Sequence, residues 1–208
     1  VAVKSLLAGK WLPSGEEVNK FERKFSKQFG KKYSLMVNSG SSANLVMIAA
    51  LKKKYGWQDG DEIIVSCVGF PTTIAPIVQN GLKPVFVDID FSDLNWDVGE
   101  IEDKITTKTR GIFSSPVLGN PYDFDAVLDI CDRNKILLIA DNCDSLGSKW
   151  RGNFLTDHAI SWHAALVVSV SIIGSNIMMG SSITSMSIAS WDIISNPWTS
   201  KEHLVSFS

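Results

Sequence analysis

The run Asn38–Leu45 combines a glycine with small hydroxyl residues in an order that suits phosphate binding. It precedes a predicted helix, Leu45–Leu51, and Gly40 permits a tight turn at its start. Ser41 and Ser42 follow where the helix should begin. A helix N-terminus presents unpaired backbone N–H groups and the positive end of the helix dipole, so this unit predicts a phosphate site. An ordinary N-cap is the alternative, because Ser and Asn are good caps.

An aromatic ring and a carboxylate elsewhere in the chain extend this chemistry. Phe70 comes shortly after the apolar run Glu62–Val68, and Asp141 directly follows the apolar run Ile136–Ala140. A phosphate site, a ring and a carboxylate together suit a planar phosphorylated cofactor such as pyridoxal phosphate. The ring stacks on the pyridine face, and the carboxylate pairs with the pyridine nitrogen and keeps it protonated. Asp141 is the predicted partner of that nitrogen, and a turn-capping Asp is the alternative.

Strands and helices that alternate along the chain must position these groups. The predicted strands are Tyr33–Val37, Glu62–Val68, Lys83–Asp90, Gly111–Ser115 and Ile136–Ala140. The predicted helices are Glu16–Phe29, Leu45–Leu51, Thr73–Gln79, Val98–Ile105 and Asp123–Arg133. Alternation with short connections predicts a mostly parallel α/β sheet, in which ligands bind beyond the strand C-termini. The predicted residues at that edge are Ser39–Ser42, Phe70, Asn120, Asp141 and Asp144.

Composition limits the class of protein. The 208 residues suffice for one domain or for part of a larger one, and a first residue Val rather than Met predicts a chain cut from something longer. A net charge of −2 does not indicate nucleic-acid binding. The apolar run Ala164–Gly174 is too short to span a membrane. Cys67, Cys131 and Cys143 lack metal-type spacing, which predicts buried free thiols in a reducing compartment.

Five motifs occur together in one order along the chain. They are Asn38–Leu45, Gly69–Thr73, Pro84–Asp90, Leu118–Pro121 and Asp141–Ser148. These motifs resemble the DegT/DnrJ/EryC1/StrS family of sugar aminotransferases, most closely its dehydrase branch, typified by CDP-4-dehydro-6-deoxyglucose 3-dehydrase. The resemblance covers Lys10–Asp157. It implies a fold-type-I pyridoxal-phosphate (PLP)-dependent transferase large domain, incomplete and confined to residues 1–157.

The resemblance implies a role for each site residue. Gly40, Ser41 and Ser42 would hold the cofactor phosphate, Phe70 would stack on its ring, and Asp141 would bind its pyridine nitrogen.

Asp144 distinguishes the branches of the family. Aminotransferases usually have His or Gln there, whereas dehydrases resemble this chain in having Asp. The implied reaction uses pyridoxamine 5′-phosphate to dehydrate a nucleotide-linked 4-keto-6-deoxy sugar at C3, in deoxysugar and lipopolysaccharide biosynthesis. A sugar aminotransferase is one alternative. A non-catalytic remnant that binds a phosphate ligand or a partner is another.

Some parts that the family uses are missing from this sequence. The catalytic base is His in dehydrases and Lys in aminotransferases, in a segment expected shortly after Asp157. That segment is absent, and neither His158 nor His163 has the right neighbours to replace it. The family's cluster-binding cysteines are absent too, so no iron–sulfur cluster is expected in this chain. The implied partners are an iron–sulfur flavin reductase and a second copy in a homodimer, in the cytoplasm.

Residues 158–208 differ in character from the rest of the chain. Ala159–Ser200 contains no Lys or Arg, has Asp192 as its only acid, and shows neither a helical nor a strand period. Codons allowed for Trp191–Phe207, read in a shifted frame, permit a Gly-Tyr-Asn-Leu-Lys segment like one in the family. We therefore expect an out-of-frame, poorly ordered tail after a deletion of the catalytic segment, and an inactive chain. A genuine divergent C-terminal segment is the alternative, and sequencing the coding DNA decides between them.

Overall fold

A computed structural model of the protein describes Leu7 and Gly15–Leu155, and the expected tail 158–208 lies outside these residues. Its centre is a four-stranded sheet of β1 (Glu62–Ser66), β2 (Lys83–Val87), β3 (Thr109–Ser114) and β4 (Leu137–Ala140). The strand order is β2-β1-β3-β4, and every neighbouring pair is parallel. The predicted parallel α/β sheet is confirmed, and four of the five predicted strands form it.

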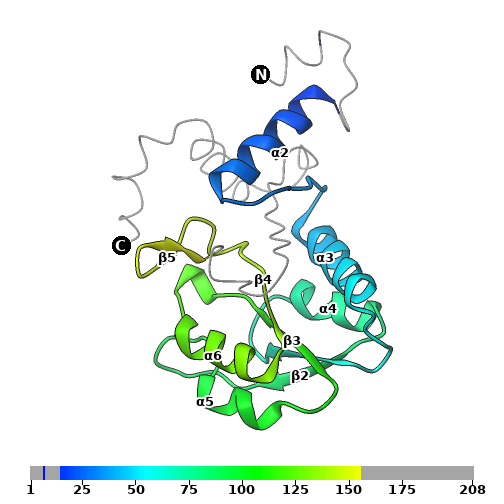
Figure 1. The fold of residues 1–208 in the computed structure, drawn as a ribbon. Coiled ribbons are helices and arrows are strands. Elements are labelled where there is room, and N and C mark those ends of the chain that lie inside the picture. Colours follow the sequence, from blue (N-terminus) through cyan, green and yellow to red (C-terminus); the bar gives the residue numbers. More distant parts are fainter. Residues whose placement is uncertain (1–6, 8–14, 156–208) are drawn as a thin grey trace. The chain divides into compact units, whose positions relative to one another are not determined.

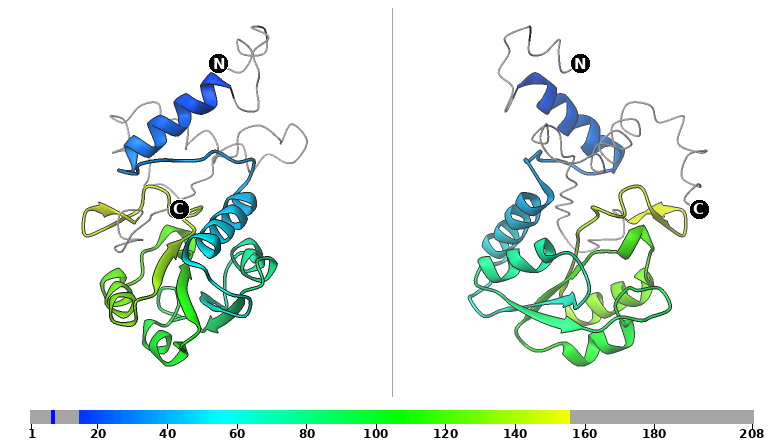
Figure 2. Two further views of the ribbon diagram at one scale, coloured as in Figure 1. Left: turned by 45° about the vertical axis from the view of Figure 1, so that its right-hand side comes forward. Right: turned by 180° about the vertical axis from the view of Figure 1, so that it is seen from behind.

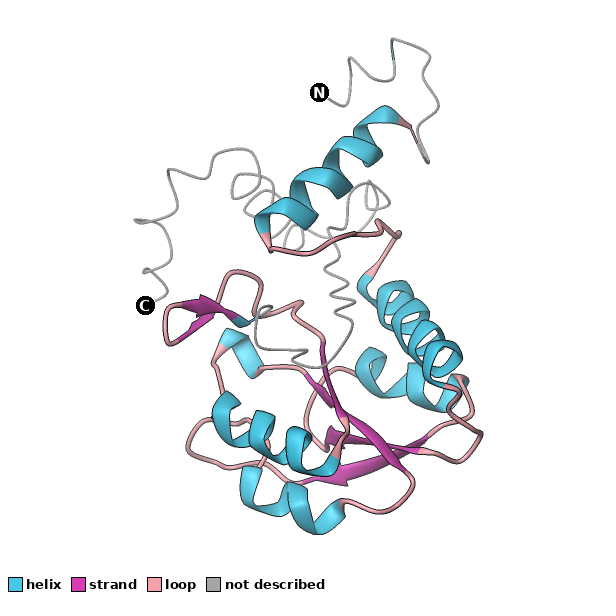
Figure 3. Ribbon diagram, viewed as in Figure 1, coloured by secondary structure: helices cyan, strands magenta, loops and turns pink. Residues whose placement is uncertain are grey.

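Helices cover both faces of this sheet (Figures 1 and 2). On one side lie α3 (Gly40–Tyr55) and α4 (Pro71–Gln79). On the other lie α5 (Val98–Ile101) and α6 (Phe124–Asn134). Three short features complete the unit, as Figure 3 shows by colour: the 3-10 turns η1 (Glu102–Lys104) and η2 (Val117–Gly119), and a hairpin of β5 (Lys149–Trp150) and β6 (Asn153–Phe154). The hairpin has no counterpart among the predicted elements.

Alternating strand residues build the core on both faces. Ile64, Ile112 and Leu138 lie side by side in the parallel register and pack with α5 and α6 residues. Their neighbours Val65 and Phe113 must point to the opposite face, because successive strand residues alternate. All five side chains are buried, which explains why these strands are almost continuously apolar in sequence.

Helix α2 (Glu16–Gln28) lies in residues 1–38, which belong to a separate compact unit, and we describe it by itself. The predicted helix is confirmed, with Phe25 and Phe29 buried. Gly30 follows with a φ of +61°, a backbone conformation that favours glycine after a helix end.

Three predictions made from local sequence are wrong. Tyr33–Val37 forms no strand in the described chain. Instead, the Met36 N–H and the Ser34 hydroxyl donate to Glu22, at 2.8 and 2.5 Å. Gly40 does not form a turn with positive φ but is the first residue of α3. Of the three free cysteines only Cys131 is buried, because the other two lie beyond the ends of β1 and β4.

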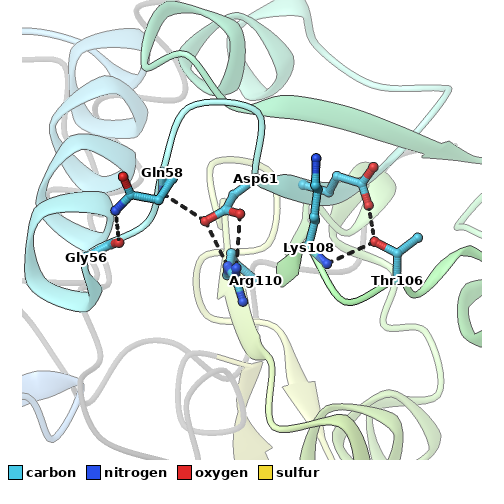
Figure 4. A network of polar contacts seen from close by, with 7 residues as sticks. Gly56, Gln58, Asp61, Thr106, Lys108 and Arg110 are labelled. Carbon is cyan, nitrogen blue, oxygen red and sulfur yellow. Dashed lines mark hydrogen bonds and ion pairs between the residues drawn. The ribbon is translucent and has the colours of Figure 1, made fainter.

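Polar residues occupy the edge of the sheet where the strands begin (Figure 4). Arg110 donates from Nε and Nη2 to the two carboxylate oxygens of Asp61, at 2.8 and 3.0 Å. The Gln58 N–H also donates to Asp61, at 2.8 Å. A cavity of about 630 Å³ opens here, with Asp61 and Arg110 in its wall. Because ligands of parallel sheets bind at the opposite edge, we assign this network to stability.

We predict that Asp61→Asn destabilises the fold in a pH-dependent way. Hydrogen bonding to Arg110 lowers the pKa of Asp61, so its contribution is present above the ordinary carboxyl pKa of about 4 and is lost as pH falls below it. The Arg110 side chain is 37% exposed. We therefore expect a loss of only ~1–2 kcal/mol at pH 7, shrinking towards pH 3. Urea unfolding at both pH values measures it, with exposed Asp103→Asn as the control; a pH-independent difference contradicts the prediction.

Candidate functional site

The first turn of α3 carries the predicted phosphate-binding residues. Ser39 is the N-cap, and its side-chain oxygen accepts a hydrogen bond from the Ser42 N–H at 3.2 Å. The Ala43 N–H bonds to the Ser39 carbonyl at 3.0 Å. The N–H groups of Gly40 and Ser41 come earlier and have no partner within the helix. Capping by Ser39 is therefore compatible with anion binding, because two N–H groups at the positive dipole end have no partner within the helix.

Gly40 is needed because the chain after β4 passes close to it. A Cβ on Gly40 would lie 3.2 Å from the Cys143 sulfur, so a larger residue would fit only if that sulfur shifted. Although Cys143 is an exposed residue, desolvation of its sulfur and the charge of Asp141 raise the pKa of the thiol above its usual range. The thiol is therefore neutral and places no negative charge beside the helix N-terminus.

Asp141 lies at the carboxyl end of β4 and is only 4% exposed. Its N–H donates to the Ser114 carbonyl at the end of β3, at 2.7 Å. Its carboxylate accepts from Asn44 Nδ2 at 2.7 Å, Thr73 Oγ1 at 3.0 Å and the Cys143 N–H at 3.1 Å. These three donors satisfy a buried negative charge without a cation, which leaves the carboxylate able to pair with a cationic ligand.

The helix α4 connects Phe70 to the same place. Phe70 is the N-cap of α4, and its carbonyl accepts from the Thr73 N–H at 3.0 Å. Thr73, one turn along the helix, contacts Asp141. The Phe70 side chain is 70% exposed, which is unusual for an aromatic residue beside a buried strand. The ring is thus accessible for stacking on a ligand at this edge.

Two other predicted residues lie in the loops of this edge. The Asp144 side chain is exposed, and the Asp144 carbonyl lies 2.8 Å from the position of a Cβ on Gly119. Asn120 is engaged in loop contacts: its carbonyl accepts from Asn95 Nδ2 at 3.2 Å. Asn120 therefore joins the loops after β2 and β3, a structural role that its place in the sequence does not reveal.

Contacts thus connect three predicted parts of the site. Cys143 lies close to Gly40 and donates its N–H to Asp141. Thr73 hydrogen-bonds to both Phe70 and Asp141. Asn44 and Thr73 are the residues that sequence reasoning missed, although Asn44 is a polar residue inside an apolar helix, which is a usable signal. A helix N-terminus, an exposed ring and a buried carboxylate form a donor and acceptor set that fits a phosphorylated pyridine cofactor.

Comparison with solved structures agrees with this architecture. The structure of E. coli GDP-4-keto-6-deoxy-D-mannose-3-dehydratase with bound hydrated PLP has 43% sequence identity and a TM-score of 0.70, over 74% of this chain and 40% of that one. The fold is that of the large domain of fold-type-I PLP-dependent transferases, present here in part.

The chain belongs to the DegT/DnrJ/EryC1/StrS aminotransferase family, whose model matches residues 1–170. It is 44% identical to GDP-4-keto-6-deoxy-D-mannose 3-dehydratase of Yersinia pseudotuberculosis, over 73% of this chain and 39% of the relative. It is 42% identical to dTDP-4-dehydro-2,6-dideoxy-D-glucose 3-dehydratase of Saccharopolyspora spinosa, over 68% of this chain and 31% of the relative. The chain thus spans less than half the length of these relatives, and the family resemblance predicted from five motifs is confirmed.

The described residues include no helix long and apolar enough to cross a membrane. They also include no cluster of three or more His, Cys, Asp or Glu side chains arranged to hold a metal ion.

Proposed function

We propose that this chain is the cofactor-binding part of an enzyme that dehydrates a nucleotide-linked 4-keto-6-deoxy sugar at C3 with pyridoxamine or pyridoxal 5′-phosphate. Two relatives that share more than 40% of aligned residues are named 3-dehydratases of such sugars, one linked to GDP and one to dTDP. The proposal therefore specifies the position of the reaction on the sugar and leaves the nucleotide open.

The buried Asp141 carboxylate is the observation that carries the proposal. The Asp141 carboxylate is 4% exposed, accepts from three neutral donors and has no cationic partner among its described contacts, so it suits pairing with a cationic group of a ligand. A pyridine nitrogen protonated by its pairing with Asp141 supplies the cation. When bound, such a cofactor acts as an electron sink for the bonds broken in the sugar.

The other residues bind and orient. We assign the cofactor phosphate to the N–H groups of Gly40 and Ser41 and to the hydroxyls of Ser41 and Ser42, at the positive end of α3. We assign the Phe70 ring to one face of the pyridine, because it is exposed and stands one turn from Thr73, which contacts Asp141. In these assignments, α3 binds the phosphate end of the cofactor and the start of α4 contacts its ring, and both helices pack on the sheet.

Asp144 favours dehydration over transamination, since it matches the dehydrase branch of the family at this position. It is exposed, so it is available to touch a substrate. The His or Lys that acts as the base is absent from this sequence, and we expect the chain alone to bind the cofactor without turning over a sugar. In the intact gene, a His at that position would support dehydration, and a Lys would support the aminotransferase alternative.

The proposed activity also implies partners and a compartment. Removal of the C3 hydroxyl needs an electron donor to complete deoxygenation, and we propose an iron–sulfur flavin reductase in that role. We also propose a homodimer for the intact protein and a cytoplasmic location, in which the free thiols Cys67, Cys131 and Cys143 stay reduced.

Binding of pyridoxamine 5′-phosphate to the purified 208-residue chain tests the proposal. The amine form is the right probe because, unlike the aldehyde, it cannot attach to surface lysines. Calorimetric titration should give saturable binding, and pyridoxamine without the phosphate should bind about tenfold to a hundredfold more weakly, since it lacks the charge-assisted bonds to α3. Absence of saturable binding would instead support a non-catalytic remnant, and equal affinity for the two ligands would remove α3 as the phosphate site.

A further inference from the structure

The hydrogen bonds to Asp141 are distributed unequally between its two oxygens. Oδ2 accepts from both Asn44 Nδ2, at 2.7 Å, and Thr73 Oγ1, at 3.0 Å. Oδ1 accepts from the Cys143 N–H, at 3.1 Å. A carboxylate offers about two acceptor positions on each oxygen. The two donors therefore fill Oδ2, whereas Oδ1 has a single backbone donor; the Cys143 thiol, a weak donor, is a further hydrogen-bond partner of the carboxylate.

The two donors on Oδ2 are themselves held in place. Asn44 and Thr73 are each only 2% exposed. The Asn44 amide also donates to the Thr72 carbonyl at 3.1 Å, and the Thr73 N–H donates to the Phe70 carbonyl at 3.0 Å. The pair thus links the N-terminal parts of α3 and α4 to the end of β4; two hydrogen bonds fix the Asn44 amide, and burial confines the Thr73 side chain.

The local structure of α3 does not explain why an Asn occupies the buried position 44. Asn is a poor residue inside a helix, and a buried amide is unfavourable unless it is hydrogen-bonded. Ser39 already supplies the cap of α3, so Asn44 is not needed for capping. Its two bonds, to Asp141 and to Thr72, are the contacts that make this amide favourable in a buried position.

We propose that Asn44 and Thr73 are positioning residues that fix the orientation of the Asp141 carboxylate and leave its Oδ1 as the acceptor for the cofactor ring nitrogen. This inference rests on the proposed function. The hydrogen bonds from Asn44 and Thr73 fix Oδ2, so the carboxylate cannot turn, and a carboxylate held in one orientation can pair with a protonated pyridine nitrogen. The two residues therefore act on the cofactor through Asp141 and do not touch it.

The test compares two ligands that differ only at the ring nitrogen. These are pyridoxamine 5′-phosphate and its 1-deaza analogue, in which C–H replaces that nitrogen. The ratio of their dissociation constants reports the bond to Asp141, whereas the affinity for the analogue reports the integrity of the rest of the site. Calorimetry gives both values for the native chain, Thr73→Val, Thr73→Ser and Asn44→Leu.

The native chain should prefer the pyridine ligand, and Thr73→Val and Asn44→Leu should each reduce that preference about threefold to tenfold, because each removes one charge-assisted donor. Thr73→Ser keeps the hydroxyl and should retain the native ratio within about twofold. Should Asn44→Leu fail to fold, the Val and Ser variants at Thr73 carry the comparison, because Val matches the shape of Thr and Ser keeps its donor.

The outcomes separate this inference from the proposed function. Loss of affinity for both ligands in equal measure, with the ratio unchanged, means that Asn44 and Thr73 only support the fold, and it overturns the inference while the cofactor site stands. A native chain that binds neither ligand overturns both. A native chain that binds both equally removes Asp141 as the partner of the nitrogen, and the inference with it.

Discussion

Asp141→Ala should bind pyridoxamine 5′-phosphate about 100-fold more weakly than the native chain, the largest effect on binding that we expect. Removing one member of a buried, hydrogen-bonded charge pair typically costs about 2–5 kcal/mol, which corresponds to a factor of about 30 or more in affinity. The variant also leaves the Asn44 and Thr73 donors without their acceptor. Calorimetric titration measures the change.

Two further variants make this result specific. Asp141→Asn keeps the size of the side chain and loses the charge, and it should lose the preference for the pyridine over the 1-deaza analogue as completely as the Ala variant. Asp103→Ala removes an exposed carboxylate at the turn η1 and should leave the affinity within about twofold, as expected for a surface site. An Asp141→Ala affinity within threefold of the native value would show that the carboxylate has another role.

The sheet was predictable because its strands are short, apolar and bounded by polar turns. Glu62–Ser66, for example, has an unbroken apolar centre, Ile63–Val65, which is buried on both faces of the sheet. Tyr33–Val37 has the same local character and is not a strand. A strand requires a neighbour with which to pair, and the apolar run alone does not show whether one exists; here Tyr33 is 73% exposed.

The site was predictable at the residues that local motifs mark. Asp141 follows a strand, and Ser39–Ser42 precede a helix, so each has a signal in its immediate neighbours. Asn44 is marked only by its polarity inside an apolar helix, and Thr73 has no such mark, because both contact Asp141, which is 97 and 68 residues away along the chain. The reason given for Gly40 was wrong, since Gly40 lies close to Cys143 at the start of α3 and does not form a turn; its role in phosphate binding stays a prediction.

Phe124→Ala should produce the largest loss of stability among the variants considered. Phe124 is fully buried at the start of α6, and its ring stacks on Tyr122 with centroids 4.0 Å apart. It also contacts Trp150 of the β5–β6 hairpin, at 6.4 Å between centroids. The substitution therefore removes a ring that joins the helix, the preceding loop and the hairpin, and it leaves a cavity that these elements cannot easily fill.

Burial of the ring accounts for the size of this effect, and an exposed Phe in the same unit tests that explanation. Truncation of a fully buried Phe costs about 3–5 kcal/mol, a large share of the 5–15 kcal/mol that stabilises a typical domain. Phe91, after β2, is 84% exposed, so Phe91→Ala should cost less than about 0.5 kcal/mol. Urea unfolding followed by far-ultraviolet circular dichroism measures both. Equal losses in the two variants would mean that the ring of Phe124 is not packed as described, because the same atoms are removed in each and only their burial differs.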